Sequence, residues 1–181
     1  SRVFLNKKKW FTLNVIGSKN DPIESIAEQI DLTIKEQWIS KGIPAPLKTK
    51  TKKTVAGVIK SLNNLIKELN KKGHGLILIV DEMGKFLDYA SSVGSDLNLF
   101  QEIAENFSNA RLNKEGEPIF IGILHQPFEE YASSLGRSVQ EDWQKIQGRF
   151  EDIPFSINTE ETANLIAKAI KQKKQDENFI K

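Results

Sequence analysis

The chain alternates between short apolar runs and longer amphipathic segments. Residues 10–16 are rich in aromatic and β-branched types between a lysine run and a Gly-Ser pair, which predicts a strand. The apolar runs within 75–82 and 119–124 predict two more strands, because an unbroken aliphatic run fits a strand buried on both faces. A fourth strand is predicted over 150–157.

Apolar residues recur at helical spacing between these runs. Asp21 followed by Pro22 is typical of an N-cap with proline at the first helical position, so a helix is predicted from about 22 to 40. Further helices are predicted at about 54–70, 96–112, 127–133, 138–147 and 159–174, while 83–90 begins a helix or an irregular turn and 91–94 is a break. This order predicts an α/β fold, a three-layer sandwich with a mainly parallel sheet covered on both faces.

The length of 181 residues predicts one domain with one core. Residues 43–53 contain two prolines and a Lys-Thr alternation, so this segment is interpreted as a basic linker or surface loop. Residues 175–181 are expected to form a frayed tail.

The composition excludes several kinds of site and of protein. No cysteine is present, so disulfides and thiolate metal sites are excluded, and the two histidines are too few for a histidine metal cluster. No apolar run approaches the roughly 20 residues that span a bilayer, and no segment resembles a signal peptide, so a cytoplasmic protein without a membrane partner is expected. The net charge of +2 does not demand a nucleic-acid partner. Lysine clusters within 7–9, 48–53 and 171–174 are either solvated surface or phosphate-binding patches.

Two of the predicted strands end in polar residues. Asp81 and Glu82 close the first long aliphatic run, and His125 and Gln126 follow the second. Ligands of open parallel sheets bind at the carboxyl ends of the strands, and neighbouring strands lie about 5 Å apart, so these side chains are expected to share a water molecule or a phosphate. Taken alone, Asp-Glu after a strand is also common as a helix N-cap.

A third motif extends this pattern, since the stretch 148–151 (Gly-Arg-Phe-Glu) enters the predicted strand at 150–157. In this order the motifs resemble the core of AAA+ or related STAND-type P-loop ATPases over about residues 75–170. The segments 81–87 and 125–131 are in addition similar to large bacterial ATP-binding proteins of the kind found with DNA-acting or defence systems. In that family a Walker B strand comes first, a strand with a polar sensor residue second, and an arginine-bearing turn third.

The resemblance implies a role for each polar residue. Asp81 would bind Mg²⁺, Glu82 would orient or activate the attacking water, and His125 or Gln126 would sense the γ-phosphate of ATP. Arg149 would act as an arginine finger on the nucleotide of a neighbouring subunit, which implies a homo-oligomer, or as a sensor within its own subunit. A DNA or protein substrate would be the target of the intact ATPase.

Two further basic residues lie near these motifs. Arg137 is the alternative to Arg149 as the functional arginine. Lys85, three residues after Glu82, is interpreted as solvent-facing in preference to a phosphate ligand.

The sequence contains no Gly-x-x-x-x-Gly-Lys-Ser/Thr loop, which in the resembled family supplies the amides and the lysine that bind the β- and γ-phosphates. We therefore interpret residues 1–181 as a partial ATPase core, in which 10–16 match the second strand of the family. ATP and Mg²⁺ are expected in the intact protein, and neither is expected to bind this chain tightly. A sheet without its central strand is expected to be rearranged or to pair with another copy.

Other functions stay open on the sequence alone. One is a domain of this fold that has discarded nucleotide binding. Another is a non-enzymatic module that binds nucleic acid or a protein through its basic loops, for which salt-sensitive DNA binding by the loop 48–53 would be the evidence. A hydrolase with His125 as base has little support, because no serine or cysteine stands in the context of a nucleophile elbow.

Overall fold

A computed structural model describes residues 9–41, 45–47, 49–93, 98–126, 130–131 and 137–153. The chain divides into two compact units, residues 1–150 and 151–181. Of the second unit only 151–153 are described, so the fold below is that of the first unit.

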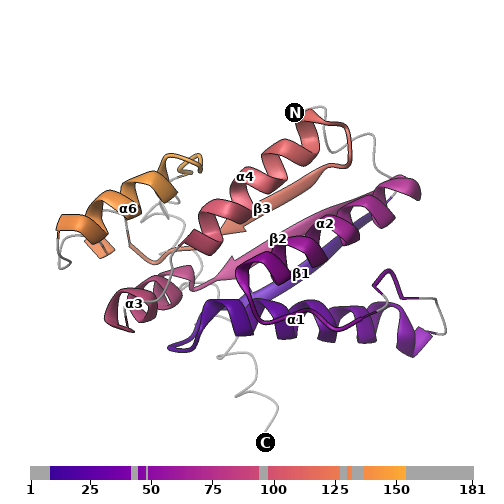
Figure 1. Ribbon diagram of the computed structural model, residues 1–181, viewed down its shortest axis with the longest axis horizontal. Helices are drawn as coiled ribbons and strands as arrows, with labels where there is room; N and C mark the ends of the chain where they lie inside the picture. Colours follow the sequence, from indigo (N-terminus) through magenta and orange to yellow (C-terminus); the bar gives the residue numbers. More distant parts are fainter. Residues whose placement is uncertain are drawn as a thin grey trace, which may run out of the picture. The chain divides into compact units, whose positions relative to one another are not determined.

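The first unit contains a three-stranded parallel sheet in the order β1-β2-β3 (Figure 1). The strands are β1 (Lys9–Ile16), β2 (His74–Asp81) and β3 (Pro118–Gly122). The parallel α/β character predicted from the sequence is confirmed. β1 and β3 each pair with β2, and no other described strand pairs with either, so the described sheet has two open edges.

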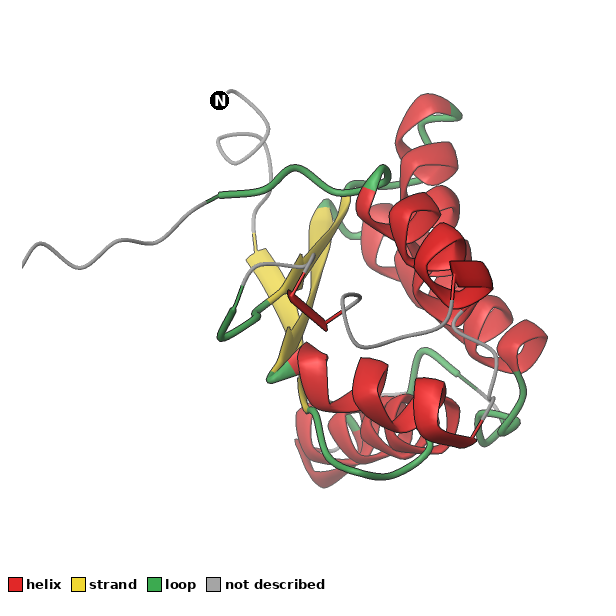
Figure 2. Cartoon of the chain, turned by 90° about the vertical axis from the view of Figure 1, so that its left-hand side faces the viewer, coloured by secondary structure: helices red, strands yellow, loops and turns green. Residues whose placement is uncertain are grey.

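Burial alternates along the C-terminal halves of β1 and β2, so one face of the sheet is packed and the other is only partly covered. Leu13 aligns with Leu78, and Leu78 with Phe120, on the packed face. On the other face, Ile79 is half-buried and Ile121 is 42% exposed. Figure 2 shows the long helices gathered on one side of the strands. The described residues thus form two layers, and a second helical layer stays a prediction.

The first two helices begin where the sequence predicts. In α1 (Pro22–Gln37) the Asp21 carboxylate accepts hydrogen bonds from the N–H groups of Ile23 (2.7 Å) and Glu24 (3.2 Å), as expected of an N-cap. A short 3₁₀ turn, η2 (Ile39–Lys41), follows. In α2 (Val55–Lys71) the Thr54 hydroxyl accepts from the N–H of Gly57 (3.1 Å).

The later helices are α3 (Met83–Val93), α4 (Asn98–Leu112) and α6 (Arg137–Gln147). The break predicted at 91–94 is wrong for residues 91–93, because α3 continues through them. Residues 150–153 are not extended in a strand, so that part of the prediction over 150–157 is also wrong. Of the predicted helix at 127–133 only 130–131 are described, and both are helical. The predictions for 154–157, 159–174 and 175–181 concern residues outside the described part of the chain.

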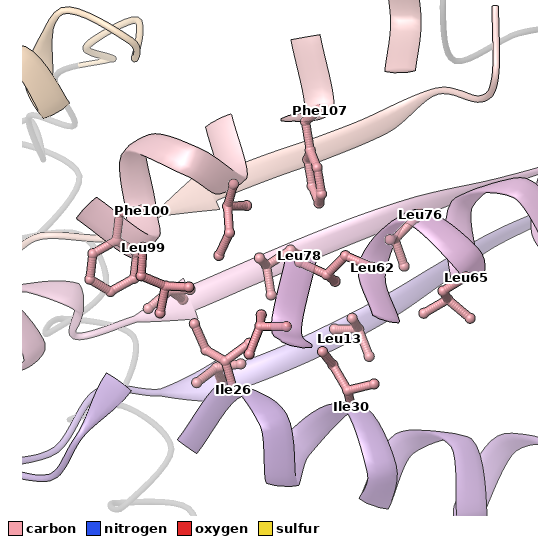
Figure 3. Close-up of a cluster of buried hydrophobic side chains, with 14 of the residues drawn as sticks. Leu13, Ile26, Ile30, Leu62, Leu65, Leu76, Leu78, Leu99, Phe100 and Phe107 are labelled. Carbon is pink, nitrogen blue, oxygen red and sulfur yellow. The ribbon is translucent and has the colours of Figure 1, made fainter. Parts of the chain in front are cut away.

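The core lies between the sheet and the helices, where α1 packs on β1, α2 on β2 and α4 on β3. Leu78, at the centre of β2, lies among leucines and isoleucines of α1 and α2 (Figure 3). Phe120 contacts Phe100 of α4 (ring centroids 6.3 Å apart) and Phe150 after α6 (5.0 Å). These ring contacts tie the end of α6 to the third strand.

The described part of the predicted basic loop 43–53 is anchored to α1. The carboxylate of Asp31 accepts hydrogen bonds from the N–H (3.0 Å) and the hydroxyl (2.9 Å) of Thr51, which is 7% exposed. Lys53 forms ion pairs with Glu28 (2.7 Å) and Glu24 (3.6 Å). The loop is therefore fixed on the protein surface at its C-terminal end.

None of the described helices combines the length and the apolar composition needed to cross a membrane.

Candidate functional site at the carboxyl end of the sheet

The candidate site lies where β2 ends. The strand finishes at Asp81, and Glu82 turns the chain directly into α3. The N–H of Gly17 donates to the carbonyl oxygen of Asp81 (2.7 Å), and the N–H of Met83 donates to that of Ile123 (3.0 Å). The segments that follow β1 and β3 therefore brace this turn from both sides.

The backbone of Glu82 is left-handed, with φ of 51°. A residue with a side chain adopts this conformation rarely, and such strain, about 1–3 kcal/mol, is concentrated at functional sites. The turn is closed by a hydrogen bond from the Glu82 N–H to Asp81 Oδ1 (2.8 Å) and by one from the Lys85 N–H to the Glu82 carbonyl (2.9 Å). This backbone fixes the direction in which the Glu82 side chain leaves the sheet.

The Glu82 carboxylate contacts two other side chains. Its Oε2 accepts a hydrogen bond from Lys85 Nζ (2.5 Å), one turn later on α3, and its Oε1 lies 3.4 Å from His125 Nε2. His125 follows β3, the neighbour of β2, so the expected meeting of the two strand ends is confirmed for Glu82 and His125. The side chain of Lys85 is 48% exposed, as expected of a solvent-facing lysine, and its ammonium also pairs with Glu82.

These contacts set the charge of Glu82. The hydrogen bond from Lys85 lowers the pKa of the Glu82 carboxyl, partial burial opposes this effect, and the contact with His125 adds to the lowering. Glu82 is therefore ionised at neutral pH. An ionised carboxylate beside an exposed imidazole can orient a water molecule and accept its proton.

Asp81 supplies the second carboxylate of the site. One oxygen, Oδ1, is engaged by the Glu82 N–H, and the side chain is exposed. The described residues contain no group of three or more His, Asp or Glu side chains arranged to hold a metal ion. The donor set does not fit a cage made by protein alone. It fits Mg²⁺, which binds through one or two carboxylates when phosphate oxygens and water complete its shell.

The other predicted site residues are not seen in contact with Glu82. Gln126 is exposed, and no described residue pairs with its side chain. The guanidinium of Arg149 is paired with Glu105 of α4 (2.6 Å), so Arg149 is not brought to Glu82. Arg137 opens α6, and its side chain lies outside what is described.

Three residues that build the site were not predicted from the sequence. A Cβ on Gly17 would lie 2.1 Å from the carbonyl oxygen of Glu82, and a Cβ on Gly84 would lie 2.3 Å from Tyr131 Oη. Because Gly17 has no side chain, the turn at Glu82 can pack against it. Because Gly84 has none, the Tyr131 ring can lie beside the first turn of α3. The signals in the sequence were a glycine directly after the first strand and another two residues after Glu82.

No protein-family model, curated protein or solved structure matches this chain. The class that the fold defines is therefore the coarse one, a parallel α/β protein with polar residues at the carboxyl end of its sheet.

Proposed function

We propose that Asp81, Glu82 and His125 form the metal- and water-binding half of a nucleotide-hydrolysing site of the AAA+ or STAND class. The observation that carries the proposal is the position of the Glu82 carboxylate. It is ionised, it projects from a strained turn at the end of the central strand, and it touches His125 from the next strand. This is the place where parallel sheets bind ligands.

The chemistry proposed is hydrolysis of the β–γ phosphoanhydride bond of ATP. Mg²⁺ bound through Asp81 would neutralise charge on the phosphate oxygens. Glu82 orients the attacking water with the oxygen that faces His125, since the contact there is the longer of its two. His125, or Gln126 beside it, donates a hydrogen bond to the γ-phosphate. Lys85 keeps Glu82 ionised.

The proposal requires two groups that do not lie beside Glu82 in this structure. A phosphate-binding loop must come from outside the 181 residues, because their sequence contains none. Arg149 reaches a nucleotide, in its own subunit or in a neighbouring one, only after its ion pair with Glu105 opens. We propose cytoplasmic action within a homo-oligomer on a DNA or protein substrate.

The first experiment titrates a fluorescent ATP analogue with Mg²⁺ into the 181-residue chain. The expected result is no turnover and no saturable binding below the millimolar range. Micromolar affinity would overturn the requirement for an external loop.

The second experiment uses the natural protein in its full length. Glu82→Gln is expected to lower the turnover of ATP at least about 100-fold, the usual effect of losing a general base, with nucleotide affinity unchanged. Glu36→Gln, an exposed glutamate on α1, is the matched control and should leave turnover unchanged. Unaltered hydrolysis in the Glu82 variant would remove this residue from its role.

A nucleic-acid-binding module based on the loop 43–53 is less well supported. Lys53, one of its cations, is already paired with Glu24 and Glu28. Counterion release on DNA needs lysines that are free to meet phosphates, so this pairing removes one of the loop's cations from that role, while Lys50 has no described partner.

A further inference from the structure

The outer edge of β1 carries backbone groups that pair with no described residue, and the alignment of β1 with β2 shows which groups they are. The bond from the Gly17 N–H to the Asp81 carbonyl, together with the alignment of Ile16 with Asp81, sets the parallel ladder. In such a ladder alternate residues face the partner strand. Residues 15 and 17 therefore face β2, and Asn14 and Ile16 direct their N–H and C=O groups away from it.

The carbonyl group of Thr12 confirms which residues of β1 point away from β2. The side chain of Gln37, at the end of α1, donates a hydrogen bond from Nε2 to the carbonyl oxygen of Thr12 (3.4 Å). Thr12 has the same parity as Asn14 and Ile16, so its carbonyl also points outward. Among the described residues, no backbone group pairs with the outward groups of Asn14 and Ile16.

These groups open into a groove of about 880 Å³ between β1, α1 and the segment that precedes α2. We call it the β1-edge groove. Its apolar rim includes Ile16 (70% exposed), Ile39 (58%) and Leu32 (46%). Figure 1 shows α1 running beside β1 at this edge of the sheet. A strand edge flanked by exposed aliphatic side chains has the features of a site for strand addition.

The charged side chains that line the β1-edge groove indicate which kind of partner it can bind. Two carboxylates line it, and both are engaged: Glu28 pairs with Lys53, and Asp31 accepts three hydrogen bonds from Thr51. Two lysines, at positions 35 and 50, also line it, and no described residue pairs with either. Lys35 and Lys50 are therefore the charged side chains of the groove that have no described partner, and a carboxylate complements them.

We propose that the β1-edge groove binds an extended segment of a partner protein, which adds to β1 as a further strand and places carboxylates opposite Lys35 and Lys50. The backbone of Asn14 and Ile16 supplies the hydrogen bonds, the aliphatic rim receives alternate apolar side chains, and the lysines select acidic segments. This site lies at the opposite edge of the sheet from β3 and does not depend on the proposed ATPase function.

The test uses a fluorescein-labelled peptide in which valines alternate with Asp and Glu, titrated into the 181-residue chain. A peptide with Asn and Gln in place of the acids should bind roughly tenfold more weakly, the factor expected for two exposed ion pairs. The double variant Lys35→Gln/Lys50→Gln should lose the same factor. The matched control Lys60→Gln/Lys72→Gln changes two exposed lysines outside the groove and should bind as the parent does.

Amide hydrogen exchange supplies the backbone readout. Saturation with the acidic peptide should slow exchange at Asn14 and Ile16, the two outward amides, and leave residue 15 unchanged because its amide is already paired. No binding up to about 1 mM, or binding without this protection, overturns the proposal. Protection in the peptide-free chain also overturns it. If the peptide-free chain shows this protection and its molecular mass doubles as its concentration rises, the edge of β1 pairs with a second copy of the chain.

Discussion

The N–H of Gly17 donates a 2.7 Å hydrogen bond to the carbonyl oxygen of Asp81, and the Cα of Gly17 packs against the carbonyl of Glu82. A residue after β1 thus supports the turn that presents the carboxylate after β2. The end of one strand shapes the site at the end of the next.

Replacing Gly17 by alanine should destabilise the protein. The added Cβ would lie 2.1 Å from a backbone oxygen that cannot move without breaking the turn, so a loss of about 1–3 kcal/mol in the free energy of unfolding is expected. Urea denaturation measures it. Gly148→Ala is the control, since its Cβ would be 3.4 Å from the nearest atom. Equal effects of the two variants would refute the close packing at Gly17.

Replacing Glu82 by glycine should separate stability from function. Glycine adopts φ of 51° without a steric penalty, so the free energy of unfolding should rise by up to about 1 kcal/mol while any activity is lost. Lys114→Gly, at φ of 58° after α4, is the matched control and should give a similar gain. A gain at Lys114 alone would mean that the contacts of Glu82 with Lys85 and His125 outweigh its strain.

Lys85 should control the titration of Glu82. The folded pKa of Glu82 is lowered from its ordinary value of 4.5, so its contribution to stability is complete above about pH 4.5 and is lost as the pH falls through the folded pKa. Lys85→Met should raise the pKa of Glu82, as followed by the ¹³C shift of its carboxyl carbon. Lys71→Met should act instead on Glu68, whose pKa is lowered by Lys71. A Glu82 titration unaffected by loss of Lys85 would contradict the pairing.

Two neighbouring residues of β2 should differ in their sensitivity to truncation. Leu78 is fully buried under the helices, so Leu78→Ala should lower the free energy of unfolding by about 2–5 kcal/mol. Ile79 is half-buried on the opposite face, so Ile79→Ala should lower it by about 1–2 kcal/mol. Thermal or urea unfolding measures both. Equal losses would show that a further layer covers Ile79.

The sequence predicted the elements whose signals are local. The start of α1 follows from Asp21 and Pro22, because an Asx cap and a fixed proline φ act within one turn. The three described strands follow from their apolar runs, and the parallel sheet follows from their alternation with helices. The meeting of Glu82 with His125 was predictable in the same way, since it needs only that β2 and β3 are neighbours.

The features that were missed depend on packing between distant segments. Arg149 pairs with Glu105 because α4 and the end of α6 come together, and no periodicity in the sequence encodes that contact. The left-handed turn at Glu82 is imposed by Gly17 and by the pairing of Met83 with Ile123, which a local pattern does not contain. α3 passes through Ser91 and Ser92 because serine is tolerated in a helix, although it resembles a break in sequence.

The partly covered face of the sheet has a consequence for how the chain behaves at high concentration. Ile79 and Ile121 lie side by side there, and with Ile123 they present aliphatic surface to water. Such patches lower solubility because two molecules that meet through them release ordered water. Threonine at positions 121 and 123 keeps the β-branched shape that suits an extended backbone, so a more soluble protein is obtainable without disturbing the packed face.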